Sequence, residues 1–129
     1  MDGVTAEVIE RIVRRHPSWC TAQGALNQCN NASRELLEEL LTNGVDAQLL
    51  WLNGPRGDLS RACPEALLVE EHLTVLVGAA VVDLTRRQWD RDAAHPTVYA
   101  ELAALTEHWH AHYEPGDDRD GKPIRFGDS

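Results

Sequence analysis

The sequence predicts an α+β fold, in which N-terminal helices pack on a small antiparallel sheet and a C-terminal helix follows the sheet. Three observations favour this class. Apolar residues recur at helical spacing over residues 5–15 and again over 31–42. Two short apolar runs between residues 71 and 85 flank Gly78-Ala79, as in a hairpin. Helical spacing then returns after Pro96.

The two N-terminal helices are expected to be amphipathic. The first runs from about Thr5 to Arg15 and ends at His16-Pro17. The second runs from about Asn31 to Thr42. An asparagine can cap its first turn, and Asn43-Gly44 ends it. Their apolar stripes are Val8, Ile9, Ile12 and Val13 in the first helix and Leu36, Leu37, Leu40 and Leu41 in the second.

The strands follow the second helix. Val45–Leu52 is largely apolar and predicts a buried strand, and the stretch Asn53–Pro64, with Gly, Pro, Arg and Asp, predicts an irregular loop. Glu71–Val77 and Ala80–Thr85 predict the two arms of the hairpin. Val98, Leu102, Leu105 and Trp109 recur at helical spacing and predict a last helix from Pro96 to about His112.

Length and composition favour one globular domain. The chain has 129 residues, of which 43% are hydrophobic and 26% charged, which is ordinary for a folded protein. We expect a single domain over residues 1–113 and a loosely ordered acidic tail over 114–129. The formal charge of -9 argues against nucleic acid as a partner, because binding to phosphates needs clusters of Lys and Arg.

The cellular compartment follows from what the sequence lacks. It has no basic and apolar secretory signal and no run of about 20 apolar residues, so we expect a cytoplasmic protein without a membrane partner. Its three cysteines, Cys20, Cys29 and Cys63, are an odd number without a CxxC pair. Reduced thiols are therefore expected, rather than disulfides or a zinc finger.

Cys29 is the strongest candidate for chemistry. It lies at the start of the second helix, where the helix dipole and free N–H groups favour negative charge and lower the pKa of a thiol. The same N–H groups can stabilise an oxyanion. A thiol nucleophile also needs an imidazole to carry its proton and a third group to orient that imidazole.

The hairpin supplies both groups. A two-residue turn at Gly78-Ala79 places Thr74 opposite Asp83, and because side chains alternate along a strand, His72 shares a face with Asp83. The two residues lie diagonally, at about 7–8 Å between backbone positions, within reach of long side chains. The sequence therefore predicts a hydrogen bond between His72 and Asp83.

These residues resemble the core of the transglutaminase-like and papain-like thiol enzymes. The order is Cys, His, Asp, and the match covers roughly Gln23 to Gln88. Cys29-Asn-Asn-Ala-Ser followed by Gly44-Val-Asp-Ala is similar to the helix-borne Cys and the entry into a strand in those families. Glu71-His72-Leu-Thr and Val82-Asp83-Leu-Thr are similar to their His strand and D-x-T strand.

The resemblance implies a role for each residue. Cys29 would be the nucleophile, His72 the general base and acid, and Asp83 the group that orients the imidazole. Gln23, six positions before Cys29, matches the oxyanion glutamine of papain-like enzymes. The candidate substrate-binding residues are Asn30, Trp51 and Trp89; an aromatic residue commonly stands in those families where this chain has Asn30.

The expected function is a cysteine-dependent hydrolase or acyltransferase that attacks an amide or ester carbonyl through a thioester. Peptidase, deamidase and amine acyltransferase chemistry all fit, and the expected partner is a protein, a peptide or a small amide or ester. No cofactor is expected. Cys20 would be the nucleophile if the helix started elsewhere.

Two other interpretations stand beside this one. Cys29 could be a small buried hydrophobic residue in a catalytically silent domain that binds proteins through its acidic surface and Trp51 or Trp89. His108, His110 and His112 suggest a metal site, but only His108 and His112 would share a face of the predicted last helix, and no carboxylate completes the set. We therefore expect no metal.

Overall fold

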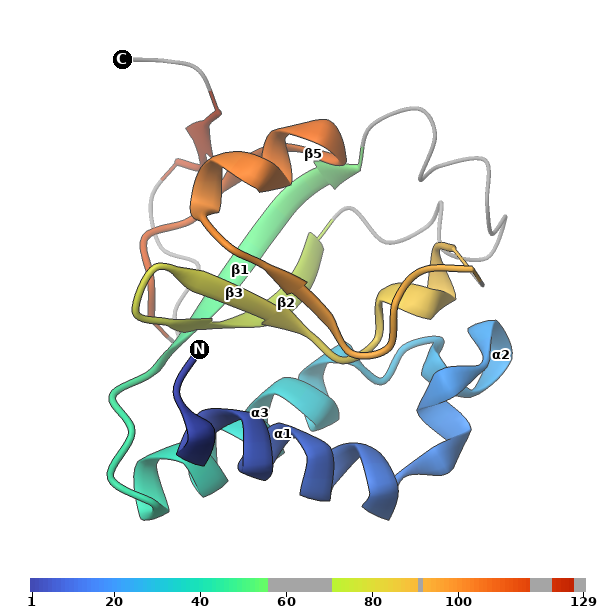
Figure 1. The fold of residues 1–129 in the computed structure, drawn as a ribbon. Coiled ribbons are helices and arrows are strands. Elements are labelled where there is room, and N and C mark those ends of the chain that lie inside the picture. Colours follow the sequence, from blue (N-terminus) through green and yellow to red (C-terminus); the bar gives the residue numbers. More distant parts are fainter. Residues whose placement is uncertain (56–70, 91, 117–121, 127–129) are drawn as a thin grey trace.

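The computed structural model describes residues 1–55, 71–90, 92–116 and 122–126. Helices come first and strands follow, as in the predicted α+β class (Figure 1). The helical elements are α1 (Gly3–Arg15), the 3₁₀ turn η1 (Pro17–Cys20), α2 (Ala22–Ala25) and α3 (Cys29–Thr42). Two further 3₁₀ turns, η3 (Arg86–Gln88) and η4 (Leu102–Glu107), lie between strands.

The strands form one open antiparallel sheet of six strands within the described residues. In space their order is β4-β3-β2-β1-β5-β6. Their bounds are β1 Gln48–Pro55, β2 Glu71–Val77, β3 Ala80–Asp83, β4 Thr97–Tyr99, β5 Trp109–His112 and β6 Ile124–Arg125. Helices α1 and α3 lie side by side below this sheet in Figure 1.

The central hairpin has the predicted register. Val77 pairs with Ala80, and Val75 pairs with Val82, around a two-residue turn. Gly78 in that turn has φ of 60°, a left-handed conformation that glycine adopts without steric cost. Because side chains alternate, this register fixes the face on which every residue of β2 and β3 lies.

The two long helices begin differently. Asp2 caps α1, because its Oδ1 accepts a hydrogen bond of 2.8 Å from the backbone N–H of Thr5. Helix α3 starts at Cys29, two residues earlier than predicted, and its N-cap residue is Gln28, which makes no side-chain capping bond. The predicted asparagine cap is therefore wrong, and no side-chain cap satisfies the N–H groups of the first turn.

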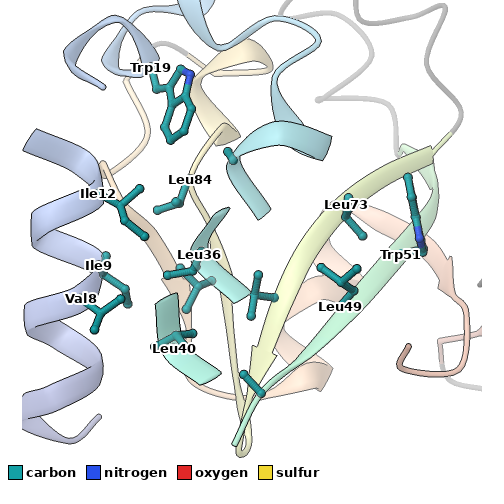
Figure 2. Packing of buried hydrophobic residues seen from close by; sticks show 14 residues of the cluster. Val8, Ile9, Ile12, Trp19, Leu36, Leu40, Leu49, Trp51, Leu73 and Leu84 are labelled. Atoms are coloured by element: carbon teal, nitrogen blue, oxygen red, sulfur yellow. The ribbon is translucent and has the colours of Figure 1, made fainter. Parts of the chain in front are cut away.

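Two apolar clusters cover the two faces of the sheet. The larger one lies between the sheet and the helices; it contains Ile9, Ile12, Leu36 and Leu40 from the helices, and Leu49, Trp51 and Leu73 from the strands (Figure 2). The second cluster covers the opposite face and consists of Leu50, Leu52, Val81, Trp89, Leu105 and Trp109. At roughly 25 cal/mol per Å² of apolar surface removed from water, these clusters supply the main force that docks the layers.

Strand β1 begins three residues later than predicted. The N–H of Val45 donates to the carbonyl of Leu40 at 2.9 Å, and Gly44 has φ of 76°. Val45 therefore completes the end of α3 instead of starting the strand. At its other end β1 continues to Pro55, into the first residues of the predicted loop; the rest of that loop, from residue 56, lies outside the described residues.

The predicted C-terminal helix over 96–112 is wrong. The segment forms β4, η4 and β5. Val98 lies on the edge strand β4, and it is 42% exposed. Residues 109–112 alternate between buried and more exposed, which is the period of a strand and not of a helix. The helical spacing of the apolar residues was therefore coincidental, because they belong to three separate elements.

The last residues of the described chain also join the sheet. Within the segment expected to be a tail, Ile124 pairs with His112 and Arg125 with Ala111.

Every helix among the described residues is too short or too polar to span a bilayer.

Candidate active site

Cys29 is the first residue of α3 and lies in the open first turn of that helix. Its side chain is partly buried and packs against the apolar cluster between helices and sheet. The first turn contains no acidic residue and has no side-chain cap. The helix dipole and the free N–H groups there therefore act on the Cys29 sulfur without competition from a carboxylate of the same turn.

The surroundings of Cys29 favour its thiolate. Burial raises the pKa of the thiol, and the charge of Asp83 adds to that effect. Hydrogen bonding to His72, the charge of the imidazole and a bond to the Leu73 backbone act in the opposite direction and prevail. The net result is a thiol with a pKa below its ordinary value, which is the condition for a reactive cysteine.

His72 and Asp83 form the predicted hydrogen-bonded pair. Nε2 of His72 lies 2.8 Å from Oδ2 of Asp83, although the two residues belong to different strands. Oδ1 of the same carboxylate accepts from the backbone N–H of Thr85 at 3.0 Å. Both side chains are almost completely buried, at 0% and 1% exposure. The carboxylate is therefore held at both oxygens and cannot turn away from the imidazole.

Two tryptophans enclose the imidazole. Trp109 stacks on the His72 ring with centroids 5.4 Å apart and an interplanar angle of 2°, and Trp89 meets the ring edge-on at 6.0 Å. Both indoles are fully buried. The packing fixes the orientation of the ring plane and excludes water from the His72–Asp83 hydrogen bond.

The charge of Asp83 governs the protonation of His72. Burial lowers the pKa of the imidazole, because a charged ring loses its hydration. The charge of Asp83, their hydrogen bond and the contact with Cys29 raise the pKa of His72 and outweigh burial. His72 is thus a stronger base than a free histidine and is suited to take a proton from a thiol.

Cys29 and His72 approach each other from different layers. His72 stands opposite Leu52 in the β1–β2 register and therefore faces the side of the sheet that carries Leu50 and Leu52. It is the second residue of β2, so it lies at the end of the strand. The start of α3 lies next to this end of β2 in Figure 1, and there the thiol reaches the imidazole.

Gln88 also reaches His72, a role that the sequence analysis does not assign to it. Its Nε2 lies 3.3 Å from Nδ1 of His72, and its Oε1 accepts from the backbone N–H of Asn27 at 3.4 Å. Gln88 is 2% exposed. The signal in the sequence is weak, because the 3₁₀ turn that directs this side chain toward the imidazole has no periodic pattern.

The other predicted site residues lie apart from the pair. Gln23 is on α2 and is exposed, and within the described part of the chain no hydrogen bond joins it to Cys29 or His72. Asn30 is exposed, and its Oδ1 accepts from Arg34 Nε at 2.6 Å. Trp51 is buried in the cluster between the helices and the sheet, at 5% exposure.

Trp89 lies inside the protein and does not face an open cleft. It packs against Trp109 at 5.4 Å and against His72, with no exposed surface. Trp89 is predicted as a substrate-binding residue, whereas the structure buries it against the imidazole of His72. The two buried tryptophans, Trp51 and Trp89, do not form a surface for binding a protein partner.

Among the described residues, the other predicted nucleophile and the predicted metal ligands take no part in this site. Cys20 is exposed at the end of η1, and Cys63 lies outside the described residues. The argument from helical spacing for His108 and His112 does not apply, because His112 is on β5 and His108 ends η4. Among the described residues no group of three or more His, Cys, Asp or Glu side chains is placed to hold a metal ion.

The arrangement defines an α+β protein in which a helix-borne thiol, a buried imidazole and a buried carboxylate come together. Comparison with family models, with curated proteins and with solved structures finds no match to this chain. What these residues do is therefore inferred from their chemistry.

Proposed function

We propose that this protein is a cysteine-dependent hydrolase or acyltransferase that acts on an amide or ester carbonyl through a thioester. The observation that carries the proposal is the convergence of Cys29, His72 and Asp83 from three elements. A thiol with a lowered pKa contacts an imidazole with a raised pKa, which a buried carboxylate orients. Perturbed titratable groups that share one site mark catalysis more often than stability.

Acylation would begin with proton transfer from the Cys29 thiol to Nδ1 of His72, because Asp83 occupies Nε2. The sulfur then forms a bond to the carbonyl carbon, and the carbonyl π electrons move to oxygen as an oxyanion. The oxyanion collapses and expels the amine or alcohol, which takes the proton from Nδ1. The products are a thioester on Cys29 and the free leaving group.

Deacylation would use the same groups in reverse. His72 Nδ1 removes a proton from water, or from an acceptor amine, as its oxygen or nitrogen attacks the thioester carbon. The second oxyanion collapses, the C–S bond breaks, and the thiolate regains the proton. Water gives a carboxylic acid and an amine acceptor gives a new amide, so hydrolysis and acyl transfer differ only in the second substrate.

The first turn of α3 is the natural place for the oxyanion. Its N–H groups have no partner within the helix and no side-chain cap, and they lie on the residue that carries the sulfur and on those that follow it. Donors that are already oriented toward the developing charge typically contribute about 3–4 kcal/mol to a transition state of this kind.

The resemblance to transglutaminase-like and papain-like enzymes supports the same function. Those families share the order Cys, His, Asp and a helix-borne nucleophile ahead of antiparallel strands. In this chain the helix that begins at Cys29 also precedes the strands that carry His72 and Asp83. Gln23, which the resemblance would assign to the oxyanion, is exposed on α2, and we assign that role to the first turn of α3.

The test uses a variant in which Cys29 is the only cysteine, with Cys20 and Cys63 replaced by serine. Its rate of alkylation by iodoacetamide, measured across pH, should show a midpoint well below the ~8.5 of a free thiol. Incubation with p-nitrophenyl acetate should release a burst of p-nitrophenol and leave an acetyl group on Cys29, detected by mass spectrometry.

A variant in which exposed Cys20 is the only cysteine serves as the matched control. It should give no burst of p-nitrophenol and should accept no acetyl group. If the alkylation midpoint of Cys29 is that of a free thiol and Cys29 accepts no acyl group, the proposed function is wrong. The chain would then fit the silent interpretation, in which the thiol is a packing residue.

A further inference from the structure

Gln88 connects two parts of the site that come from distant segments of the chain. It ends η3, shortly after the strand that carries Asp83, and its carboxamide lies between the His72 imidazole and the backbone of Asn27. Asn27 stands two residues before Cys29. Because the amide is buried, these two contacts replace hydrogen bonds that it would otherwise make with water.

The contact with Asn27 determines which end of the amide faces the imidazole. A backbone N–H can only donate, so the group opposite Asn27 must be the oxygen Oε1 of Gln88. Nε2, which carries the two N–H donors, then faces His72 Nδ1 at 3.3 Å. The orientation of Gln88 therefore does not depend on a choice between two similar end groups.

A donor at Nδ1 requires a lone pair on that nitrogen. His72 can satisfy Gln88 and Asp83 together only as the neutral ring with its proton on Nε2, where Asp83 accepts it. Protonation of Nδ1 would direct an N–H toward the N–H groups of Gln88. Gln88 thus stabilises the neutral ring, whereas Asp83 stabilises the charged one.

The backbone of Asn27 makes this arrangement rigid. Asn27 has φ of 62°, the only positive φ at a residue other than glycine in the described part of the chain. Asparagine tolerates this conformation better than most residues, and here it aims the N–H at Gln88 just before the chain enters α3. If the Gln88 amide turned over, its NH₂ group would face the backbone N–H of Asn27, and two donors would oppose each other.

The other charged groups near the ring act on His72 directly or through Asp83. Among the described residues the groups that act on His72 are Asp83 from β3 and Cys29 from α3. His95 and Tyr99 interact with the charge of Asp83. Arg87 in turn acts on His95, and Arg86 acts on Tyr99. Gln88 hydrogen-bonds to Nδ1, the nitrogen that would receive the proton of Cys29, and Cys29 also hydrogen-bonds to the ring.

We propose that Gln88 is a positioning residue that donates to Nδ1 of His72, favours the neutral ring against the effect of Asp83, and must move away from Nδ1 when that nitrogen takes a proton. This inference concerns the control of the site and rests on the proposed function, in which Nδ1 takes the proton of Cys29. Gln88 would thereby oppose transfer of the Cys29 proton to His72, without preventing it.

The direct test is the ¹⁵N NMR titration of His72 in the full-length protein. At pH values above the midpoint of its protonation, Nε2 should show the shift of a protonated nitrogen and Nδ1 that of a bare one. A proton on Nδ1 in that pH range would overturn the inference. This measurement needs no substitution, so it does not depend on whether a variant folds.

Two variants then test the sign of the effect. Gln88→Met removes the donor and should raise the pH midpoint of His72 protonation by about one unit. The net free energy of one hydrogen bond is similar to that of a shift of one pKa unit. Gln88→Glu keeps an acceptor for Asn27 and places a charged acceptor at Nδ1, so it should raise the midpoint further. Gln48→Met makes the same change at an exposed position of β1 and should leave the midpoint unchanged.

The outcomes separate this inference from the proposed function. If Cys29 forms the acetyl thioester but neither Gln88 variant raises the midpoint of His72, the inference about Gln88 is wrong and the proposed function stands. If the midpoint rises as expected but Cys29 accepts no acyl group, the control of His72 is correct and the proposed function is wrong.

Discussion

The hydroxyl of Ser33 donates a hydrogen bond of 2.8 Å to the backbone carbonyl of Leu73, and both residues are buried. Ser33 is one turn after Cys29 in α3, and Leu73 follows His72 in β2. The bond therefore fastens the helix to the strand beside the two residues that must meet.

Replacement of Ser33 by alanine should destabilise the protein and loosen the site. The carbonyl of Leu73 would lose its side-chain donor in a buried position, which costs about 1–3 kcal/mol. Urea unfolding gives this loss, and the alkylation rate of Cys29 at pH 7 should fall in the same variant. Ser18→Ala, at an exposed position, is the control and should change neither quantity. Unaltered alkylation in Ser33→Ala would show that the bond does not set the position of Cys29.

Asp83→Asn should reduce acyl transfer far more than it reduces stability. The N–H of Thr85 keeps the amide oxygen on its own side, so the new NH₂ group would face Nε2 of His72. The imidazole proton would then have to move to Nδ1, which leaves no base for the thiol. In a comparable arrangement the wrong tautomer costs on the order of 10⁴-fold in turnover.

Pre-steady-state release of p-nitrophenol measures this effect. Asp46→Asn removes the same charge at an exposed position and should retain the rate of the unmodified protein. A loss of less than about tenfold in Asp83→Asn would contradict the orienting role of the carboxylate, because a correctly oriented base contributes at least about 10²-fold.

Stability should depend on pH through the buried pair. In a Cys29→Ser background, which removes the coupled thiol, Asp83 still raises the pKa of His72 above its unfolded value of about 6.5. A raised pKa stabilises the folded state fully below that value, and this contribution is lost as pH rises toward the folded pKa. The expected decrease is about 1.4 kcal/mol for each unit by which the folded pKa exceeds the unfolded one.

Urea unfolding at several pH values from about 5 to 9 gives the slope. Adding Asp83→Asn should flatten it, because the imidazole then has no charged partner. The contribution of every other titrating residue is common to both proteins and cancels in the comparison. Equal slopes in the two variants would mean that Asp83 does not control the protonation of His72.

Trp109→Leu should disturb the base as well as the core. Removing the indole from the face of His72 leaves a cavity and should cost about 2–4 kcal/mol in stability. Trp109→Phe retains a ring over the imidazole and should cost less. The NMR midpoint of His72 should shift in Trp109→Leu, because water gains access to the ring.

The control for this prediction is Trp19→Leu. Trp19 belongs to the other apolar cluster and stacks on His16 at 4.0 Å. Its replacement should reduce stability through lost packing but leave the midpoint of His72 unchanged. A shift of equal size in both variants would show that general loosening, rather than contact with the imidazole, controls the midpoint.

The parts of the site that the sequence predicts correctly are those fixed by short-range rules. A two-residue turn at Gly78 determines the register of the hairpin, and side-chain alternation then places His72 and Asp83 on one face. The presence of α3 and its end at Thr42 follow from its apolar stripe and its glycine stop, whereas its start lies two residues before the predicted one. These rules act within about a dozen residues, so no knowledge of the rest of the fold is required.

The remaining features depend on contacts between distant segments. Trp109 belongs to a strand because it pairs with Pro55 of β1, and this pairing overrides the helical spacing of the apolar residues before it. Gln88 points at His72 because a 3₁₀ turn happens to direct it there, and such a turn has no period to recognise. The resemblance to papain-like enzymes implies that Gln23 lies near Cys29, but Gln23 is exposed on α2.

The order of the strands also has a consequence for self-association. The outermost strands are β4, with three residues, and β6, with two. Within the described residues, a second molecule that approached β4 or β6 would find only a few backbone donors and acceptors free to extend the sheet. Long central strands are thus shielded by short borders, an arrangement that protects an open sheet from growing into aggregates.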